Sequence, residues 1–74
     1  MNDRTEYINH IRQTISDNFS ALTGDAGIEN WNRELCQQYI EEEWEISENE
    51  IFDGDTAEQY IKDILDWTEY ALNN

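Results

Sequence analysis

The sequence predicts an all-α fold, a compact three-helix bundle with a short extended segment near residues 43–47. Three segments repeat apolar residues with the period of a helix that buries one face. Valine and proline are absent and glycine occurs only at positions 24, 27 and 54, which disfavours a β fold and leaves few breaks. Because 74 residues suffice for only one small core, we expect a single acidic helical domain over residues 1–74.

The first predicted helix begins after Asn2 or Asp3, either of which could cap it, and ends in the turn of residues 23–27. Two glycines in that turn tolerate left-handed backbone. One narrow face of the helix carries the apolar residues Ile8, Ile11, Ile15, Phe19 and Leu22. The opposite face carries His10, which we expect to be a solvated surface histidine.

The second predicted helix begins near Ile28. Its apolar stripe is Ile28, Trp31, Leu35 and Tyr39, with Cys36 and Ile40 on the flank. Continuing this stripe would bring Glu42 and Glu43 into the core, so we expect the helix to end, bend or leave the core near residues 41–43. Residues 43–47 then alternate polar with apolar side chains, which is the period of an extended strand. The competing interpretation is a continuing helix with Trp44 on a new face.

The third predicted helix has the clearest pattern. Asp55 caps its start, and Glu58 three residues later completes a capping-box pattern. The apolar arc consists of Ala57, Tyr60, Ile61, Ile64, Leu65, Thr68, Ala71 and Leu72. The opposite arc consists of Asp55, Glu58, Lys62, Asp66 and Glu69. Three amphipathic helices with short connections favour a bundle.

Few chemistries fit the rest of the composition. The single cysteine, Cys36, and the single histidine, His10, can form neither an internal disulfide nor a four-ligand zinc site. Placing Gly54 at the sixth position of a calcium loop puts Ile51 and Tyr60 where oxygen ligands are needed, so that register fails. No nucleophile motif is present. We therefore expect no enzymatic activity, no catalytic residue, no metal and no cofactor.

Charge is the main functional signal. The formal net charge is −14, and the stretch from Glu41 to Glu58 contains nine carboxylates without a lysine or arginine. Such a surface repels nucleic-acid phosphates and anionic membranes, so we expect a basic protein as partner and no direct nucleic-acid or membrane contact. The N-terminus lacks a signal-peptide pattern and no apolar run reaches about 20 residues, so we expect a cytoplasmic location.

Thirteen residues are candidates for contacting that partner. They are Glu41, Glu42, Glu43, Trp44, Glu45, Glu48, Glu50, Asp53, Asp55, Glu58, Asp66, Glu69 and Tyr70. Carboxylates one helical turn apart stand about 6 Å apart, close to the phosphate spacing along a DNA strand. Exposed aromatic side chains near such a row are typical interface anchors. The pattern therefore favours a surface that can replace DNA in a basic groove.

In size, acidity, low cysteine content and lack of an enzymatic motif, the chain resembles the small acidic inhibitors encoded by phages and other mobile elements. These include antirestriction proteins and several anti-CRISPR proteins. The resemblance covers the whole chain in composition, with no motif by which residues could be carried over. It implies a stoichiometric DNA-mimicking inhibitor of a CRISPR effector or restriction enzyme, acting in the host cell cytoplasm.

Two other functions remain open. An immunity protein or antitoxin would use the same acidic face to neutralise one basic toxin with tight, single-partner affinity. A non-inhibitory acidic accessory protein would carry the charge only for solubility, and it could form a homodimer through Trp44 and Ile46.

Overall fold

The structure, a computed structural model, describes residues 2–74. These residues form four α-helices and one 3-10 turn, which are joined by loops. The helices are α1 (Arg4–Asp17), α2 (Phe19–Thr23), α3 (Arg33–Glu43) and α4 (Ala57–Asn73), and the turn η1 (Glu48–Glu50) lies between α3 and α4. No strand occurs in these residues. The predicted all-α bundle is therefore confirmed.

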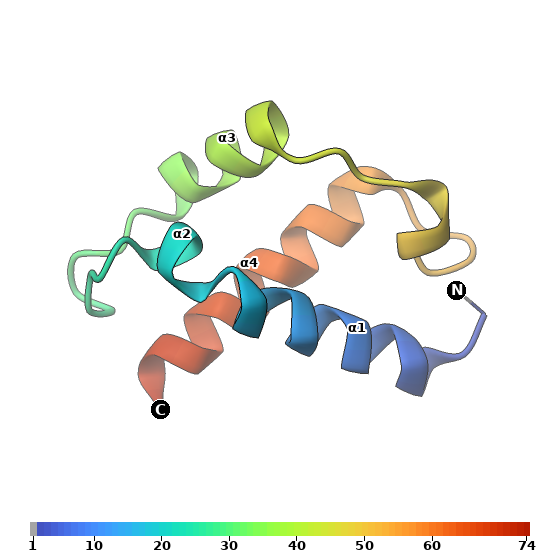
Figure 1. Ribbon diagram of the computed structural model, residues 1–74, viewed down its shortest axis with the longest axis horizontal. Coiled ribbons are helices and arrows are strands. Elements are labelled where there is room, and N and C mark those ends of the chain that lie inside the picture. The colour runs from blue at the N-terminus through green and yellow to red at the C-terminus, as the bar shows by residue number, and fades with distance from the viewer. Residues whose placement is uncertain (1) are drawn as a thin grey trace.

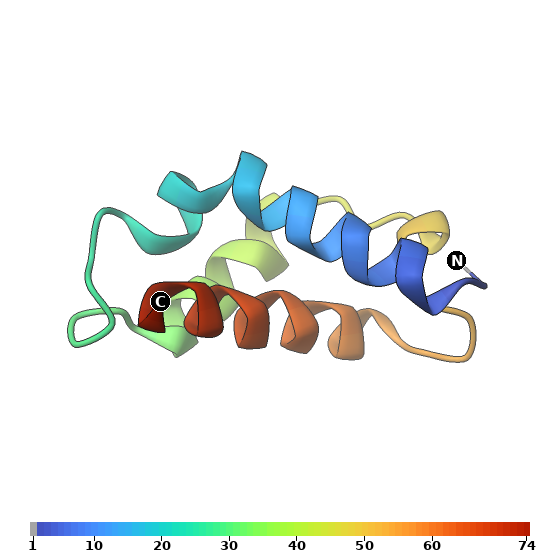
Figure 2. The same ribbon diagram turned by 90° about the horizontal axis from the view of Figure 1, so that it is seen from below.

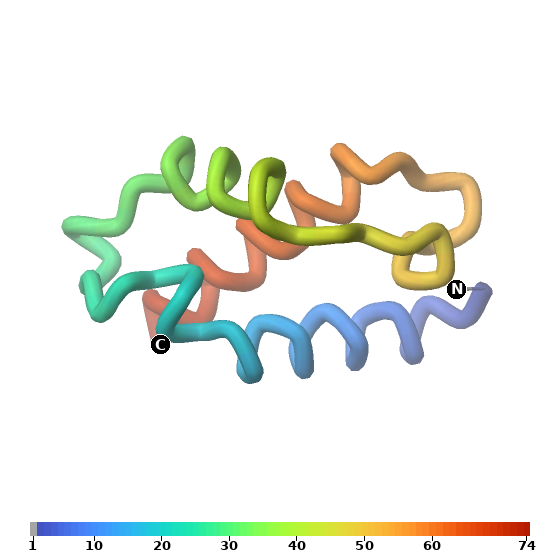
Figure 3. Tube along the Cα trace, turned by 45° about the horizontal axis from the view of Figure 1, so that its top comes forward, coloured from blue at the N-terminus to red at the C-terminus, as the bar shows by residue number. Residues whose placement is uncertain are grey.

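Helix α4 is the centre of the bundle, because it packs against α1, α2 and α3 (Figure 1). Helices α1 and α4 run in the same general direction, and α3 runs back against them. From the side, α1 and α4 form two layers (Figure 2). The connection from α3 to α4 reaches the end of the molecule where the N-terminal residues lie (Figure 3). This connection runs along α1, with Trp44 and Glu45 near the last turn of α1 and Phe52 beside its start.

The start of α1 agrees with the prediction, whereas its end does not. The Asp3 carboxylate accepts hydrogen bonds from the backbone N–H groups of Thr5 and Glu6 at 2.8 and 3.3 Å. The helix predicted to continue to Leu22 is interrupted at Asn18, whose side-chain amide donates to the carbonyl of Thr14 at 2.8 Å. Asparagine competes in this way for helix carbonyls. Leu22 is still buried, because α2 resumes after the break.

Helix α3 buries a different face from the one predicted. Its buried side chains are Cys36 and Ile40, whereas Leu35 is 62 % exposed and Ile28 is 36 % exposed. The predicted stripe was wrong because the helix begins only at Arg33, after the Asn32 cap. Residues 28–31 therefore lie in the preceding loop and cannot extend a helical stripe.

The end of α3 is as predicted. The helix stops at Glu43, and Trp44 has extended backbone with φ −94° and ψ 138°. Trp44 and Ile46 are half-buried against the core, while Glu45 between them is exposed. The predicted alternation is thus confirmed in an extended segment that pairs with no strand in residues 2–74.

The core face of α4 is confirmed, but its cap is not. The buried residues of the helix are Tyr60, Ile61, Ile64, Leu65 and Thr68. The cap is Thr56, whose hydroxyl accepts from the backbone N–H of Gln59 at 3.2 Å, rather than Asp55. The sequence did hold this signal, since Thr56 and Gln59 also have capping-box spacing.

Replacing Thr56 with Ala should lower the free energy of unfolding by about 1 kcal/mol, because an N-terminal N–H of α4 loses its acceptor. Asp55→Asn is the control, and it should lower stability by less than half as much. Urea unfolding followed by tryptophan fluorescence measures both. A larger loss for Asp55→Asn would restore Asp55 as the cap.

Candidate functional site

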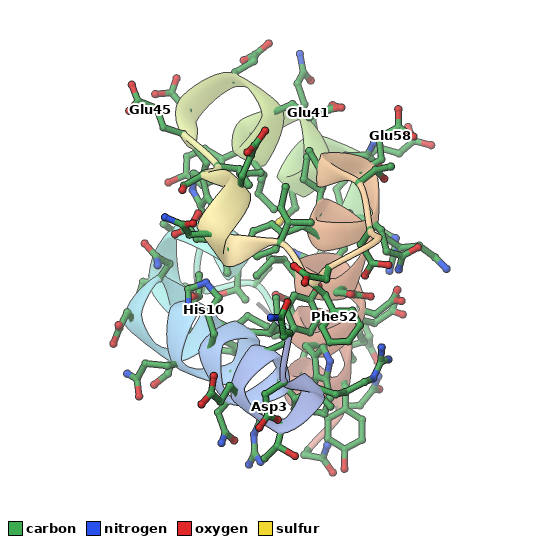
Figure 4. The ribbon with its side chains drawn as sticks, turned by 90° about the vertical axis from the view of Figure 1, so that its right-hand side faces the viewer. Asp3, His10, Glu41, Glu45, Phe52 and Glu58 are labelled. Carbon is green, nitrogen blue, oxygen red and sulfur yellow. The ribbon has the colours of Figure 1, made fainter. Side chains whose placement is uncertain are left out.

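Carboxylates from residues 41–58 lie on one side of the bundle, from the last turn of α1 beside Glu45 to the start of α1 beside Phe52, and we call this surface the acidic end. Its exposed members are Glu41, Glu42, Glu43, Glu45, Glu48, Asp53 and Glu58. They come from the end of α3, the α3–α4 connection and the start of α4. Figure 4 faces this end and shows Glu41, Glu45 and Glu58 on one side of Phe52 and Asp3 on the other. The structure thus brings together most of the predicted binding residues.

Most of these carboxylates have no cationic partner. Within residues 2–74, no lysine, arginine or histidine lies within 4.0 Å of the carboxylates of Glu41, Glu42, Glu43, Glu45, Glu48 or Glu58. The arginine at this end, Arg4, instead stands over the Phe52 ring at 5.3 Å. Lys62 shares a shallow groove with Glu41 and Glu58 without reaching either at ion-pair distance. The acidic end therefore projects a concentrated negative field.

Glu50 and Asp55 are only half-exposed, and Glu50 has a structural contact. The Glu50 carboxylate accepts from the backbone N–H of Ser47 at 3.1 Å and thereby closes a capping box on η1. It also lies 4.0 Å from Nε2 of His10, which is 3.1 Å from the Tyr60 hydroxyl. His10 is therefore half-buried between α1, η1 and α4, and the prediction of a solvated surface histidine was wrong.

The predicted row of acids along α4 is not continuous. Arg33 on α3 binds Asp66 at 2.7 Å and lies 4.0 Å from Glu69. These two carboxylates therefore link α3 to α4. Only Glu58 and Asp55, at the start of the helix, belong to the acidic end.

The two predicted aromatic anchors lie far apart. Trp44 is half-buried beside the acidic end and stacks edge-on against Tyr39, with ring centroids 6.4 Å apart. Tyr70 is 63 % exposed and packs against Trp67. Twelve residues of helix separate it from Glu58, a rise of about 18 Å. Tyr70 is therefore not part of the acidic end.

A buried polar pair behind the acidic end was missed by the sequence analysis. The Tyr7 hydroxyl donates to Asp63 at 2.5 Å, joining α1 to α4, and the Tyr7 ring is 2 % exposed. Burial and then the Asp63 carboxylate raise the pKa of Tyr7 far above its usual range. Burial and then Glu50 raise the pKa of Tyr60 to about 12. Tyr7 lies on the α1 face beside Ile11, so the helical period could have identified it.

These raised pKa values predict alkaline instability. The folded state holds the phenol protons of Tyr7 and Tyr60 more tightly than the unfolded chain does, so their contribution to stability is complete below about pH 10. The Tyr60 contribution should be lost as the pH rises toward 12, and the Tyr7 contribution should continue to fall at higher pH. Urea unfolding at a series of pH values measures the loss. Tyr60→Phe should flatten this slope and the exposed control Tyr70→Phe should not; equal slopes for the two variants would contradict the explanation.

Other kinds of site find little support in the described residues. Among residues 2–74, no group of three or more histidine, cysteine or acidic side chains is arranged to hold a metal ion. None of the helices in that range combines the length and apolar character needed to cross a membrane. Comparisons with protein-family models, curated proteins and solved structures gave no match.

Proposed function

We propose that this protein inhibits a basic nucleic-acid-binding protein by placing its acidic end in the groove that otherwise receives phosphates. A CRISPR effector or a restriction enzyme is the target class that the overall character of the chain suggests. The observation that carries the proposal is the set of six exposed glutamates that have no lysine, arginine or histidine of residues 2–74 within 4.0 Å, namely Glu41, Glu42, Glu43, Glu45, Glu48 and Glu58. The protein binds its target directly and acts without chemistry of its own.

The position of three of these acids supports a role in binding. Glu41, Glu42 and Glu43 occupy the last turn of α3, where no basic residue is present. The helix dipole is negative at that end, so anionic side chains there lower helix stability. Charge that served only solubility would be equally effective elsewhere on the surface. A destabilising cluster at one place is expected where a partner supplies the compensating positive charge.

The proposed mimicry is one of charge density. Because Arg33 holds Asp66 and lies near Glu69, α4 does not present a regular row of carboxylates that resembles the phosphates of a DNA strand. The acidic end instead offers a compact anionic surface, which would be steered toward a positive groove at a rate that falls as salt increases.

A second candidate function is neutralisation of one basic toxin. Trp44 favours it, because a half-buried aromatic ring beside the acids could anchor a single partner tightly. Both functions use the acidic end, and the identity of the captured protein separates them.

The experiment is a pull-down from nuclease-treated host lysate with the tagged protein and its Glu41/Glu42/Glu43/Glu45→Gln variant. We expect one dominant nucleic-acid-binding protein that the variant loses. A single toxin would favour the immunity function. Many basic proteins that moderate salt removes, or no protein, would indicate an accessory protein whose charge is only a solvated surface.

A further inference from the structure

An apolar strip lies along the outward side of α3. We define it as Trp31, Leu35, Tyr39 and Trp44. Leu35 is 62 % exposed, and the three aromatic residues are half-buried. Leu35 and Tyr39 are one helical turn apart, and Tyr39 stacks on Trp44. Scattered exposed apolar residues need no explanation, whereas an exposed leucine one helical turn from a contacting aromatic pair, Tyr39 and Trp44, does.

The strip borders a groove between α2 and α3. Leu22, Trp31, Leu35 and Tyr39 line this groove, whose volume is about 320 Å³. Trp31 is fixed in place because its indole N–H donates to the carbonyl of Leu22 at 3.0 Å. Leu22 is buried in the core and Trp31 and Tyr39 pack one side against it, whereas Leu35 remains exposed. The groove is thus a firm apolar surface that the bundle itself leaves uncovered.

The charges around the strip are negative. Glu42 lies seven residues after Leu35 on the same helix face, and Glu43 and Glu45 flank Trp44 in the chain. All three are exposed. The cations of the chain are placed elsewhere: Arg33 on Asp66, Lys62 in the α3–α4 groove, Arg4 over Phe52 and Arg12 beside Trp67. A partner segment that covers the strip must therefore be cationic as well as apolar.

We infer that the strip binds a segment of the target protein that carries one or two large apolar side chains flanked by Lys or Arg. The apolar side chains enter the α2–α3 groove, and the cations face Glu42, Glu43 and Glu45. This inference rests on the proposed function, from which it takes the basic character of the partner. It adds an apolar contact, by which the protein would distinguish one basic protein from another. Charge alone gives fast, salt-sensitive binding, whereas an apolar anchor gives specificity.

The test uses two fluorescein-labelled peptides of equal charge, each about 14 residues long. One is a helical Leu–Lys peptide with its leucines on one face, and the other has Ser in place of every Leu. Leu35→Ser should weaken binding of the Leu–Lys peptide about tenfold and leave the Ser–Lys peptide unchanged. Tyr70→Ser is the matched control, because Tyr70 is 63 % exposed and lies on another face. It should change neither affinity, and thermal melts should show all variants folded.

The outcomes separate this inference from the proposed function. Unchanged Leu–Lys affinity in Leu35→Ser, or no measurable binding, overturns the strip as a docking site. A loss in Tyr70→Ser instead assigns the peptide to the groove of Trp67 and Tyr70 and also overturns it. A dimer in sedimentation that Leu35→Ser dissociates would show that a second copy covers the strip. Failure of the Glu41/Glu42/Glu43/Glu45→Gln variant to weaken either peptide would reject both the acidic end and the cation contacts inferred for Glu42, Glu43 and Glu45, while a selective Leu35→Ser effect would still support the apolar contact in the groove.

Discussion

Replacing Ile64 with Asp is expected to abolish cooperative thermal unfolding of the protein. Ile64 is fully buried in α4, the helix that packs against α1, α2 and α3. No cation lies within the buried core to pair with a carboxylate there, since the buried residues of the described chain are apolar apart from Thr23 and Thr68. An unpaired buried charge costs several kcal/mol. The whole stability expected of a 74-residue domain is only roughly 4–11 kcal/mol.

The matched control for this change is Leu35→Asp. It makes the same kind of substitution at a position that is 62 % exposed, in the first turn of α3, where a carboxylate suits the helix dipole. Circular dichroism should show a flat thermal profile for Ile64→Asp and a cooperative melt for Leu35→Asp. A normal melt for Ile64→Asp would mean that the core face of α4 is misplaced.

Neutralising Glu41, Glu42, Glu43 and Glu45 by substitution with Gln is expected to weaken binding to a basic partner by about 100-fold at low salt. The same change should raise the melting temperature by about 5 °C, because it removes mutual repulsion and unfavourable charges from the last turn of α3. A lower affinity together with a higher melting temperature is the result that identifies a binding role for these acids. Calorimetric melts and binding to the protein captured in the pull-down measure the two effects, and the affinity difference should shrink as salt increases.

A charge-matched control variant also loses four negative charges, but from positions outside the acidic end. Asp25→Asn, Glu29→Gln, Glu34→Gln and Glu69→Gln remove four charges from the α2–α3 connection, the start of α3 and the later part of α4. This variant should keep nearly full affinity. If it loses as much affinity as the acidic-end variant, net charge alone drives binding and the acidic end is not a site.

Local sequence patterns predicted several features that depend on neighbouring residues, although they missed the break at Asn18 and the Thr56 cap. The Asp3 cap, the left-handed Gly24 after α2, the end of α3 at Glu43 and the extended segment after it are confirmed. Gly27 does not have left-handed backbone, and Asp25 does instead. The caps and turns depend on contacts within a few residues. The end of α3 is fixed because consecutive glutamates cannot be buried. The core face of α4 was also predicted, because its apolar period runs for several turns without conflict.

The features that depend on packing between elements were not predicted. Helix α3 carries apolar residues around more than one face, so only the bundle decided that Cys36 and Ile40 point inward and Leu35 outward. Likewise, Arg33 meets Asp66 and Tyr7 meets Asp63 across distances of 33 and 56 residues in the chain, which no local pattern can encode.

The sequence by itself therefore determined that this is an all-α protein with a long run of carboxylates lacking nearby cations along the chain. Only the tertiary structure decided which carboxylates act together. Arg33 pairs with Asp66 and lies near Glu69, so these two carboxylates are not free, while the path from α3 to α4 places the exposed acids of residues 41–58 on one surface. The physical reason is that charge content is fixed residue by residue, whereas a charged surface depends on which side chains the packed helices place side by side.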